Sequence, residues 1–67
     1  MEIRFDHKRI SALREQHGLT IYETARKLGT TQQNVSNWEV GIGPNISSLE
    51  KICALFGVTP NYFFEIK

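Results

Sequence analysis

Four residues at fixed spacing constrain the fold of this chain more than any other feature of its sequence: Ala25, Gly29, Val35 and Trp38. Each has a steric role when two helices meet near a right angle across a tight turn. A small Ala25 lets the second helix pack close to the first, and Gly29 supplies the positive φ that the turn requires. Val35 and Trp38 lie on one side of the second helix and bury it. The spacing therefore predicts two short helices joined by a tight turn.

Capping residues mark where these two helices begin. Thr20 opens a sequence of the form S/T-x-x-E, a capping box that satisfies the free amides at a helix start. The first helix of the pair then runs to Leu28. Thr31 is placed to cap the second helix, over residues 32–39. Together the signals predict a helix-turn-helix at residues 20–39.

The rest of the chain also has the pattern of short helices. Asp6 and Asn45 are the expected caps of helices over residues 6–17 and 45–56, each followed by a glycine. A threonine followed by proline predicts a short fifth helix over residues 59–65. We expect no strand, internal repeat or linker. The predicted fold class is all-α, with five short helices around one core.

The composition of residues 1–67 is that of one ordinary globular domain, with 40% hydrophobic and 22% charged residues. These values argue against a disordered or collagen-like chain. No apolar stretch approaches the roughly 20 residues that a membrane-spanning helix needs. The first residues lack the apolar segment of a signal peptide. We therefore expect a cytoplasmic protein with a single domain.

Catalytic and metal chemistry find little support in the sequence. The one cysteine, Cys53, excludes an internal disulfide. His7, His17 and Cys53 match no metal-ligand spacing. No combination of nucleophile, base and oxyanion donor is visible. We expect no enzyme activity, no metal, no cofactor and no small-molecule ligand.

Burial of Val35 and Trp38 turns an unusual polar face outward. A solvated helix face normally carries Lys and Glu, but this face carries only uncharged amides and a hydroxyl. Gln and Asn amides bond adenine bidentately at its N6 and N7 edge in the major groove. The alternative is a merely polar surface, since Gln also favours helices. Base readout is the favoured interpretation because the amides cluster at the helix start, and its candidate residues are Gln32, Gln33, Asn37 and Ser36.

Residues 10–64 resemble the Cro/C1-type helix-turn-helix family of phage repressors, plasmid regulators and restriction-modification controllers. The segment Gly29-Thr-Thr-Gln-Gln33 is particularly similar to lambdoid phage repressors, in which glutamines that open the recognition helix touch A·T-containing half-sites. The resemblance implies a lambda-repressor-like fold of five helices and dimeric binding to a two-fold-related DNA operator. It is carried by Ile10, Leu13, Arg14, Gly18-Leu-Thr20, Ala25, Leu28-Gly29, Val35-Ser-Asn-Trp38-Glu39, Gly41, Leu49, Ile52 and Phe56-Gly57-Val58.

The resemblance also implies an ion pair between Arg14 and Glu39, which would tie the first helix to the recognition helix. Phosphate contacts are harder to assign, because the net charge is only +1 and the loop after the recognition helix lacks basic residues. Amides at helix starts favour anions and can substitute for charge. Thr24 is a further departure, since it stands where the family prefers leucine. The candidate phosphate contacts are Thr20, Thr31, Asn45, Ser47, Lys8 and Arg9.

The apolar end of the chain suggests a second subunit. Phe63 is the expected core residue of this segment, whereas Tyr62, Phe64 and Ile66 are candidates for a homodimer contact. Packing of these side chains on the chain's own core would explain their apolar character nearly as well as a dimer contact. The leading hypothesis is a homodimeric, sequence-specific regulator of transcription, a repressor, that binds double-stranded DNA at an inverted repeat. The alternative is a protein-interaction module, such as an antitoxin or adaptor, which the weak basic balance and apolar C-terminal segment favour.

Overall fold

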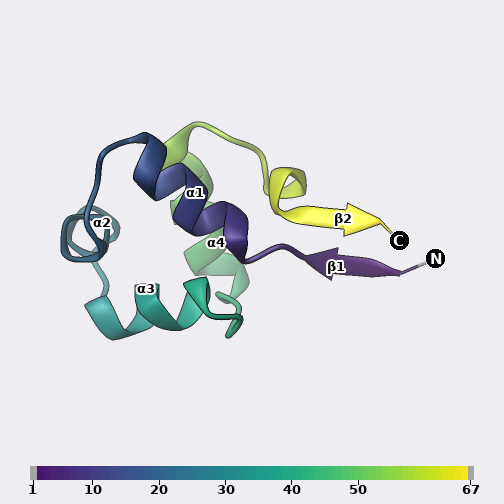
Figure 1. Ribbon diagram of the computed structural model, residues 1–67, viewed down its shortest axis with the longest axis horizontal. Helices are drawn as coiled ribbons and strands as arrows, with labels where there is room; N and C mark the ends of the chain where they lie inside the picture. Colours follow the sequence, from purple (N-terminus) through teal and green to yellow (C-terminus); the bar gives the residue numbers. More distant parts are fainter. Residues whose placement is uncertain (1, 67) are drawn as a thin grey trace.

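The part of the chain that the structure describes, residues 2–66, forms a helical body from which a two-stranded ribbon projects (Figure 1). The structure is a computed structural model. In chain order the elements are β1 (Ile3–Phe5), α1 (Lys8–Gln16), α2 (Ile21–Leu28), α3 (Gln32–Glu39), α4 (Ile46–Phe56), the 3-10 helix η1 (Pro60–Phe63) and β2 (Phe64–Ile66).

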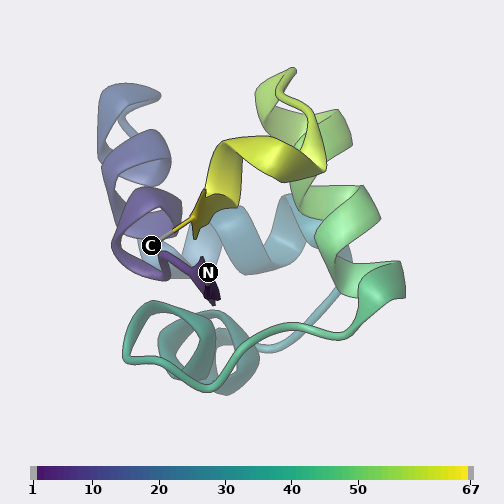
Figure 2. The same cartoon turned by 90° about the vertical axis from the view of Figure 1, so that its right-hand side faces the viewer.

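One apolar core holds the helical body together. Figure 2 shows α1 and α4 on opposite sides of the body, with α2 behind and α3 below. All four α-helices and η1 contribute buried side chains to the core, so α3 has one buried side and one side that faces outward. The core side chains are Ile10, Leu13, Ala25, Leu28, Val35, Trp38, Ile52, Cys53, Phe56 and Phe63.

The four α-helices and their capping residues confirm the predicted all-α helix-turn-helix fold. Thr20, Thr31 and Asn45 are the N-caps of α2, α3 and α4, and each side chain accepts a hydrogen bond from a backbone amide in the first turn. One boundary differs, because α1 begins at Lys8 rather than at Asp6. Asp6 still serves the helix start, since its Oδ1 accepts a hydrogen bond from the Lys8 amide at 3.1 Å.

The short fifth helix predicted over residues 59–65 is present only as a 3-10 turn, and the prediction of a chain without strands was wrong. Pro60 does begin a helical turn, but the turn is a 3-10 helix that ends at Phe63. The chain then becomes β2, which pairs antiparallel with β1. The register places Ile3 opposite Ile66, Arg4 opposite Glu65 and Phe5 opposite Phe64.

The ribbon forms because the two ends of the chain match each other. Both strands alternate apolar, charged and apolar residues, which gives the ribbon one apolar and one charged face. The Phe5 ring lies 5.8 Å from the Phe63 ring and 5.4 Å from the Phe64 ring. The Asp6 amide donates to the Phe63 carbonyl at 2.6 Å. These long-range contacts override the local helical signal of the proline.

Candidate nucleic-acid interface

Short-range hydrogen bonds fix the starts of α2 and α3, and a glycine forms the turn between them. At the start of α2, the Glu23 amide donates to Thr20 Oγ1 at 3.1 Å, and the Thr20 amide donates to Glu23 Oε1 at 3.0 Å. Gly29 ends the helix with φ +70°, a left-handed conformation that favours glycine. The Asn34 amide donates to Thr31 Oγ1 at 3.1 Å at the start of α3. These bonds fix the residues at which α2 and α3 begin.

Packing on the core determines which side of α3 faces outward. Val35 is fully buried and Trp38 is 8% exposed, so the inner side of the helix is held firmly. Of the predicted readout residues, Gln32 and Gln33 are exposed, and Ser36 and Asn37 are half-buried. All four therefore lie away from the buried stripe, on one polar face. We call Gln32, Gln33, Ser36 and Asn37 the amide face.

Two side-chain hydrogen bonds organise the amides of α3. Gln33 Nε2 donates to Asn37 Oδ1 at 2.9 Å, one helical turn further along. Asn34 Nδ2 donates to Thr30 Oγ1, also at 2.9 Å, at the edge of the turn. Asn34 was not among the predicted readout residues, although it is exposed and carries the same chemistry. Its spacing of four residues from Thr30 is the signal in the sequence that indicates this contact.

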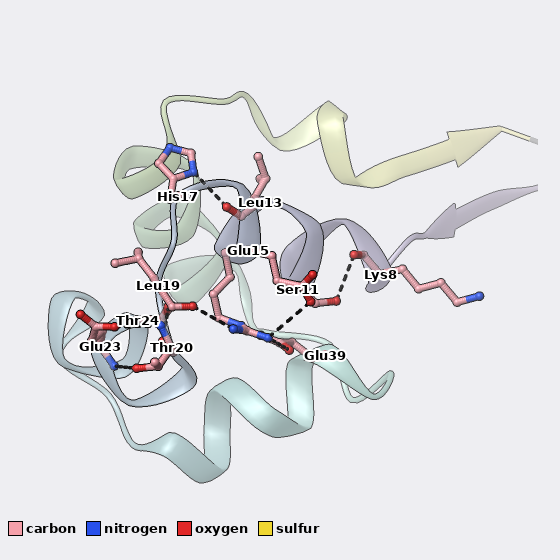
Figure 3. A network of polar contacts seen from close by, with 11 residues as sticks. Lys8, Ser11, Leu13, Glu15, His17, Leu19, Thr20, Glu23, Thr24 and Glu39 are labelled. Carbon is pink, nitrogen blue, oxygen red and sulfur yellow. Dashed lines mark hydrogen bonds and ion pairs between the residues drawn. The ribbon is translucent and has the colours of Figure 1, made fainter.

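A half-buried ion pair links α1 to the end of α3 (Figure 3). Arg14 Nε donates to Glu39 Oε2 at 2.7 Å, and a second bond of 3.2 Å reaches Oε1. A third donor of the guanidinium bonds the Leu19 carbonyl at 2.8 Å. The hydrogen bond to Glu39 raises the pKa of Arg14 above its ordinary value. Glu39 therefore has an internal role, as the resemblance implies, and its charge is neutralised near the amide face.

The candidate phosphate contacts fall into two groups. Thr20, Thr31 and Asn45 cap three helices, and Ser47 lies exposed in the first turn of α4. The other group is at the start of α1, where Lys8 is exposed and Figure 3 shows its amine pointing away from the Arg14 network.

Arg9, the other basic candidate at the start of α1, is engaged within the chain. Its NH1 donates to the Tyr62 carbonyl at 2.5 Å, and its Nε lies 3.4 Å from Asp6 Oδ2. The guanidinium also lies 5.2 Å from the centre of the Tyr62 ring. These contacts direct Arg9 towards the C-terminal segment instead of leaving it free for a phosphate.

The residues predicted for a dimer contact differ in exposure. Tyr62 is half-buried under Arg9, whereas Phe64 is 39% and Ile66 71% exposed. Ile3, which sequence reasoning missed, is 69% exposed and lies opposite Ile66. Only strand pairing brings Ile3 to this place, and the sequence gives no local signal of that pairing. Ile3, Phe64 and Ile66 form an exposed apolar patch on the ribbon, which we call the ribbon patch.

Metal-ligating side chains, the cysteine thiol and the lengths of the helices bear on other chemistry in the described part of the chain. Residues 2–66 contain no group of three or more His, Cys, Asp or Glu side chains that could hold a metal ion. Burial, with a smaller contribution from the charge of Glu50, raises the pKa of the Cys53 thiol. No helix among these residues is long and apolar enough to cross a membrane.

A tightly turned helix pair, with one helix buried by Val35 and Trp38 and exposing uncharged amides, defines the helix-turn-helix class of domain. Residues 10–63 match the protein family described as Helix-turn-helix, and the chain belongs to this Cro/C1-type family. Among solved structures it is similar to SinR, the master regulator for biofilm formation, in a crystal structure with DNA. That similarity has a TM-score of 0.77 and 29% sequence identity, and covers 85% of this chain and 94% of the SinR chain. A comparison with curated proteins gave no match.

Proposed function

We propose that this chain is a sequence-specific DNA-binding regulator of transcription that places α3 in the major groove. The observation that carries the proposal is the amide face, which is held outward by the burial of Val35 and Trp38. Its amides supply paired donors and acceptors, the chemistry that reads base edges. The similarity to SinR, whose structure was solved with DNA, supports the same use of the fold.

Affinity in the proposed complex comes from helix starts more than from charge. Each of the helix starts at Thr20, Thr31 and Asn45 offers backbone amides and a partial positive charge to a phosphate. Ser47 and Lys8 add an exposed hydroxyl and an exposed ammonium group. Arg9 is left out, because its guanidinium already bonds Tyr62 and Asp6. Lys8 is then the one charged side chain left among the candidate phosphate contacts, so the affinity should fall less steeply with salt than for a strongly basic binder.

The regulator acts in this proposal as a homodimeric repressor at an inverted repeat. We assign the contact with the second subunit to the ribbon patch. Compared with the residues expected from the sequence, Ile3 replaces Tyr62. Isolated exposed apolar residues are ordinary, but three grouped on one face favour an interface. Figure 1 shows the ribbon at the end of the molecule opposite α2, so a second subunit there leaves α3 uncovered. Replacing Ile3 and Ile66 by serine should lower the dimer fraction in sedimentation without unfolding the monomer.

A protein-interaction module is the second candidate, and the ribbon patch with the low net charge favours it. The two candidates separate in a selection of duplexes from a random pool at low and moderate salt, with Gln33→Ala in parallel. An enriched inverted repeat with half-sites about 10 bp apart supports the dimeric regulator. Gln33→Ala should then lose preference at one base, at a cost of about 1–3 kcal/mol. A pool with no enriched sequence at either salt rejects base readout and leaves the protein-interaction module.

A further inference from the structure

The hydrogen bond between Gln33 and Asn37 distinguishes one amide of α3 from its neighbours. Gln32 and Gln33 are adjacent and both exposed, but only Gln33 bonds a side chain on the same helix face, at 2.9 Å. Within the described chain the Gln32 side chain has no partner. The main chain of Asn37 lies in the closing turn of α3, where its backbone carbonyl accepts the amides of Val40 at 3.3 Å and Ile42 at 2.9 Å. The shorter Asn37 side chain therefore holds the end of the longer Gln33 side chain through one hydrogen bond.

The stereochemistry of a carboxamide makes this bond compatible with base readout. The amide nitrogen of Gln33 has two hydrogens, and the bond to Asn37 uses one of them. If the hydrogen trans to Oε1 makes that bond, the second hydrogen and Oε1 lie on one edge of the amide, in the order that meets N7 and N6 of adenine. Guanine offers two acceptors at the same edge, N7 and O6, so an amide held in this orientation would direct Oε1 at O6. The contact with Asn37 thus favours one purine over the other.

We infer that Asn37 is a positioning residue that locks the Gln33 amide for adenine, and that this pair sets one position of each half-site. The inference rests on the proposed function, because it assigns a base to the same helix face. Asn37 acts through Gln33 by supplying an acceptor from one turn away. Gln32, which has no such acceptor, is the unlocked counterpart and sets no purine preference through this device.

Selection from the random duplex pool with Asn37→Ala and Asn37→Asp tests the inference. The wild-type chain should enrich adenine over guanine about tenfold at the Gln33 position, in line with one bidentate contact. Asn37→Ala removes the acceptor, and the ratio there should fall below about threefold, while positions that neither Gln33 nor Asn37 contacts keep theirs. Asn37→Asp retains an acceptor oxygen and should keep the adenine preference, although repulsion from phosphates weakens binding throughout. Thermal unfolding of both variants checks that they fold.

The outcomes separate the inference from the function on which it rests. If the wild-type chain selects an operator and Asn37→Ala keeps the adenine preference, or weakens all positions equally, the inference is wrong and the regulator stands. If the wild-type chain selects nothing, the proposed function fails and takes the inference with it. Side-chain NMR of the free wild-type protein adds a test that needs no variant. The Gln33 amide should show a higher order parameter than the Gln32 amide, and equal values would overturn the locking.

Discussion

The helix pair α2–α3 and the ribbon β1–β2 are both short, yet they are held in opposite ways. In the helix pair, the capping bonds of Thr20 and Thr31 join residues three apart in the chain. In the ribbon, the contacts join residues from the two ends of the chain, and the side chain that seats it, Phe63, belongs to the core of the helical body. The first region specifies its geometry locally, whereas the second depends on the rest of the fold.

This difference assigns different tasks to the two regions. A structure specified by local bonds and two buried anchors can hold the amide face in one orientation, which base readout requires. The ribbon contributes little burial of its own, since Ile3, Phe64 and Ile66 remain exposed. A region of this kind suits an interface that is completed by a partner. Four substitutions, each with a matched control, test how sharply the two regions differ.

The largest effect is expected where the ribbon meets the core. Phe63 is fully buried and Phe64, its neighbour, is 39% exposed. Phe63→Ala should lower the free energy of unfolding by about 3–5 kcal/mol, since it opens a cavity among Phe5, Tyr62 and the core. Phe64→Ala should cost about 1 kcal/mol or less. Urea unfolding measures both, and equal losses would show that the ribbon itself, not its core anchor, carries the stability.

The next effect concerns the link between α1 and α3. Glu39→Gln removes the carboxylate from a guanidinium whose side chain is only 15% exposed. We expect a loss of about 2–3 kcal/mol in urea unfolding, because the Arg14 charge then keeps only the exposed carboxylate of Glu15 near it. Glu15→Gln is the control, since Glu15 lies 3.9 Å from Arg14 and is 71% exposed. Its loss should stay below about 0.5 kcal/mol, as for a surface pair. A comparable loss in the control would contradict the role given to Glu39.

A smaller effect on stability is expected at the threonines that precede α2 and η1. Thr20 caps α2 through its hydroxyl, whereas Thr59 precedes η1 and its side chain makes no capping bond to a backbone amide. Thr20→Ala should lower the unfolding free energy by about 1 kcal/mol. Thr59→Ala should change it by only a few tenths of a kcal/mol. Thermal unfolding of the two variants side by side gives the comparison. The reverse order would mean that local capping does not distinguish the helix pair from the C-terminal segment.

The smallest expected effect is on stability at low pH, and it concerns Asp6. Burial acts to raise the pKa of Asp6, but hydrogen bonds with Glu65, the Lys8 amide and Arg9 bring it below the ordinary value of 3.8. The folded chain therefore prefers ionised Asp6, and this stabilisation is complete above pH 3.8 and lost as the pH falls through the lower folded value. Asp6→Asn should show a shallower fall in melting temperature in this acid range. Glu2→Gln, an exposed control paired with Arg4, should keep the wild-type fall; a wild-type fall in Asp6→Asn would contradict the prediction.

Sequence reasoning performed well where structure is local. The caps at Thr20, Thr31 and Asn45 and the buried pair Val35 and Trp38 follow from spacing alone. Thr24, a departure from the family pattern, is buried without cost in hydrogen bonds because its hydroxyl donates to the Thr20 carbonyl at 3.0 Å.

Long-range pairing was the limit of that reasoning. Each strand has only three residues, too few to reveal a period, and its partner lies at the other end of the chain. The exposure of Ile3 and the commitment of Arg9 to Tyr62 both follow from that pairing. The hydrogen bond from Gln33 to Asn37 was also missed, although both residues were predicted to read bases. Their spacing allows the contact, but the same spacing fits two independent side chains.

The burial of Trp38 has a practical consequence for spectroscopy. It is the only tryptophan of the chain, and it lies on the inner side of α3, 8% exposed. Indole emission shifts to longer wavelengths when water reaches the ring, so its fluorescence reports whether α3 is seated on the body. Because the ring faces away from the amide face, a duplex bound there as proposed would not contact it. The chain thus carries an intrinsic optical probe that separates loss of structure from loss of ligand without a dye.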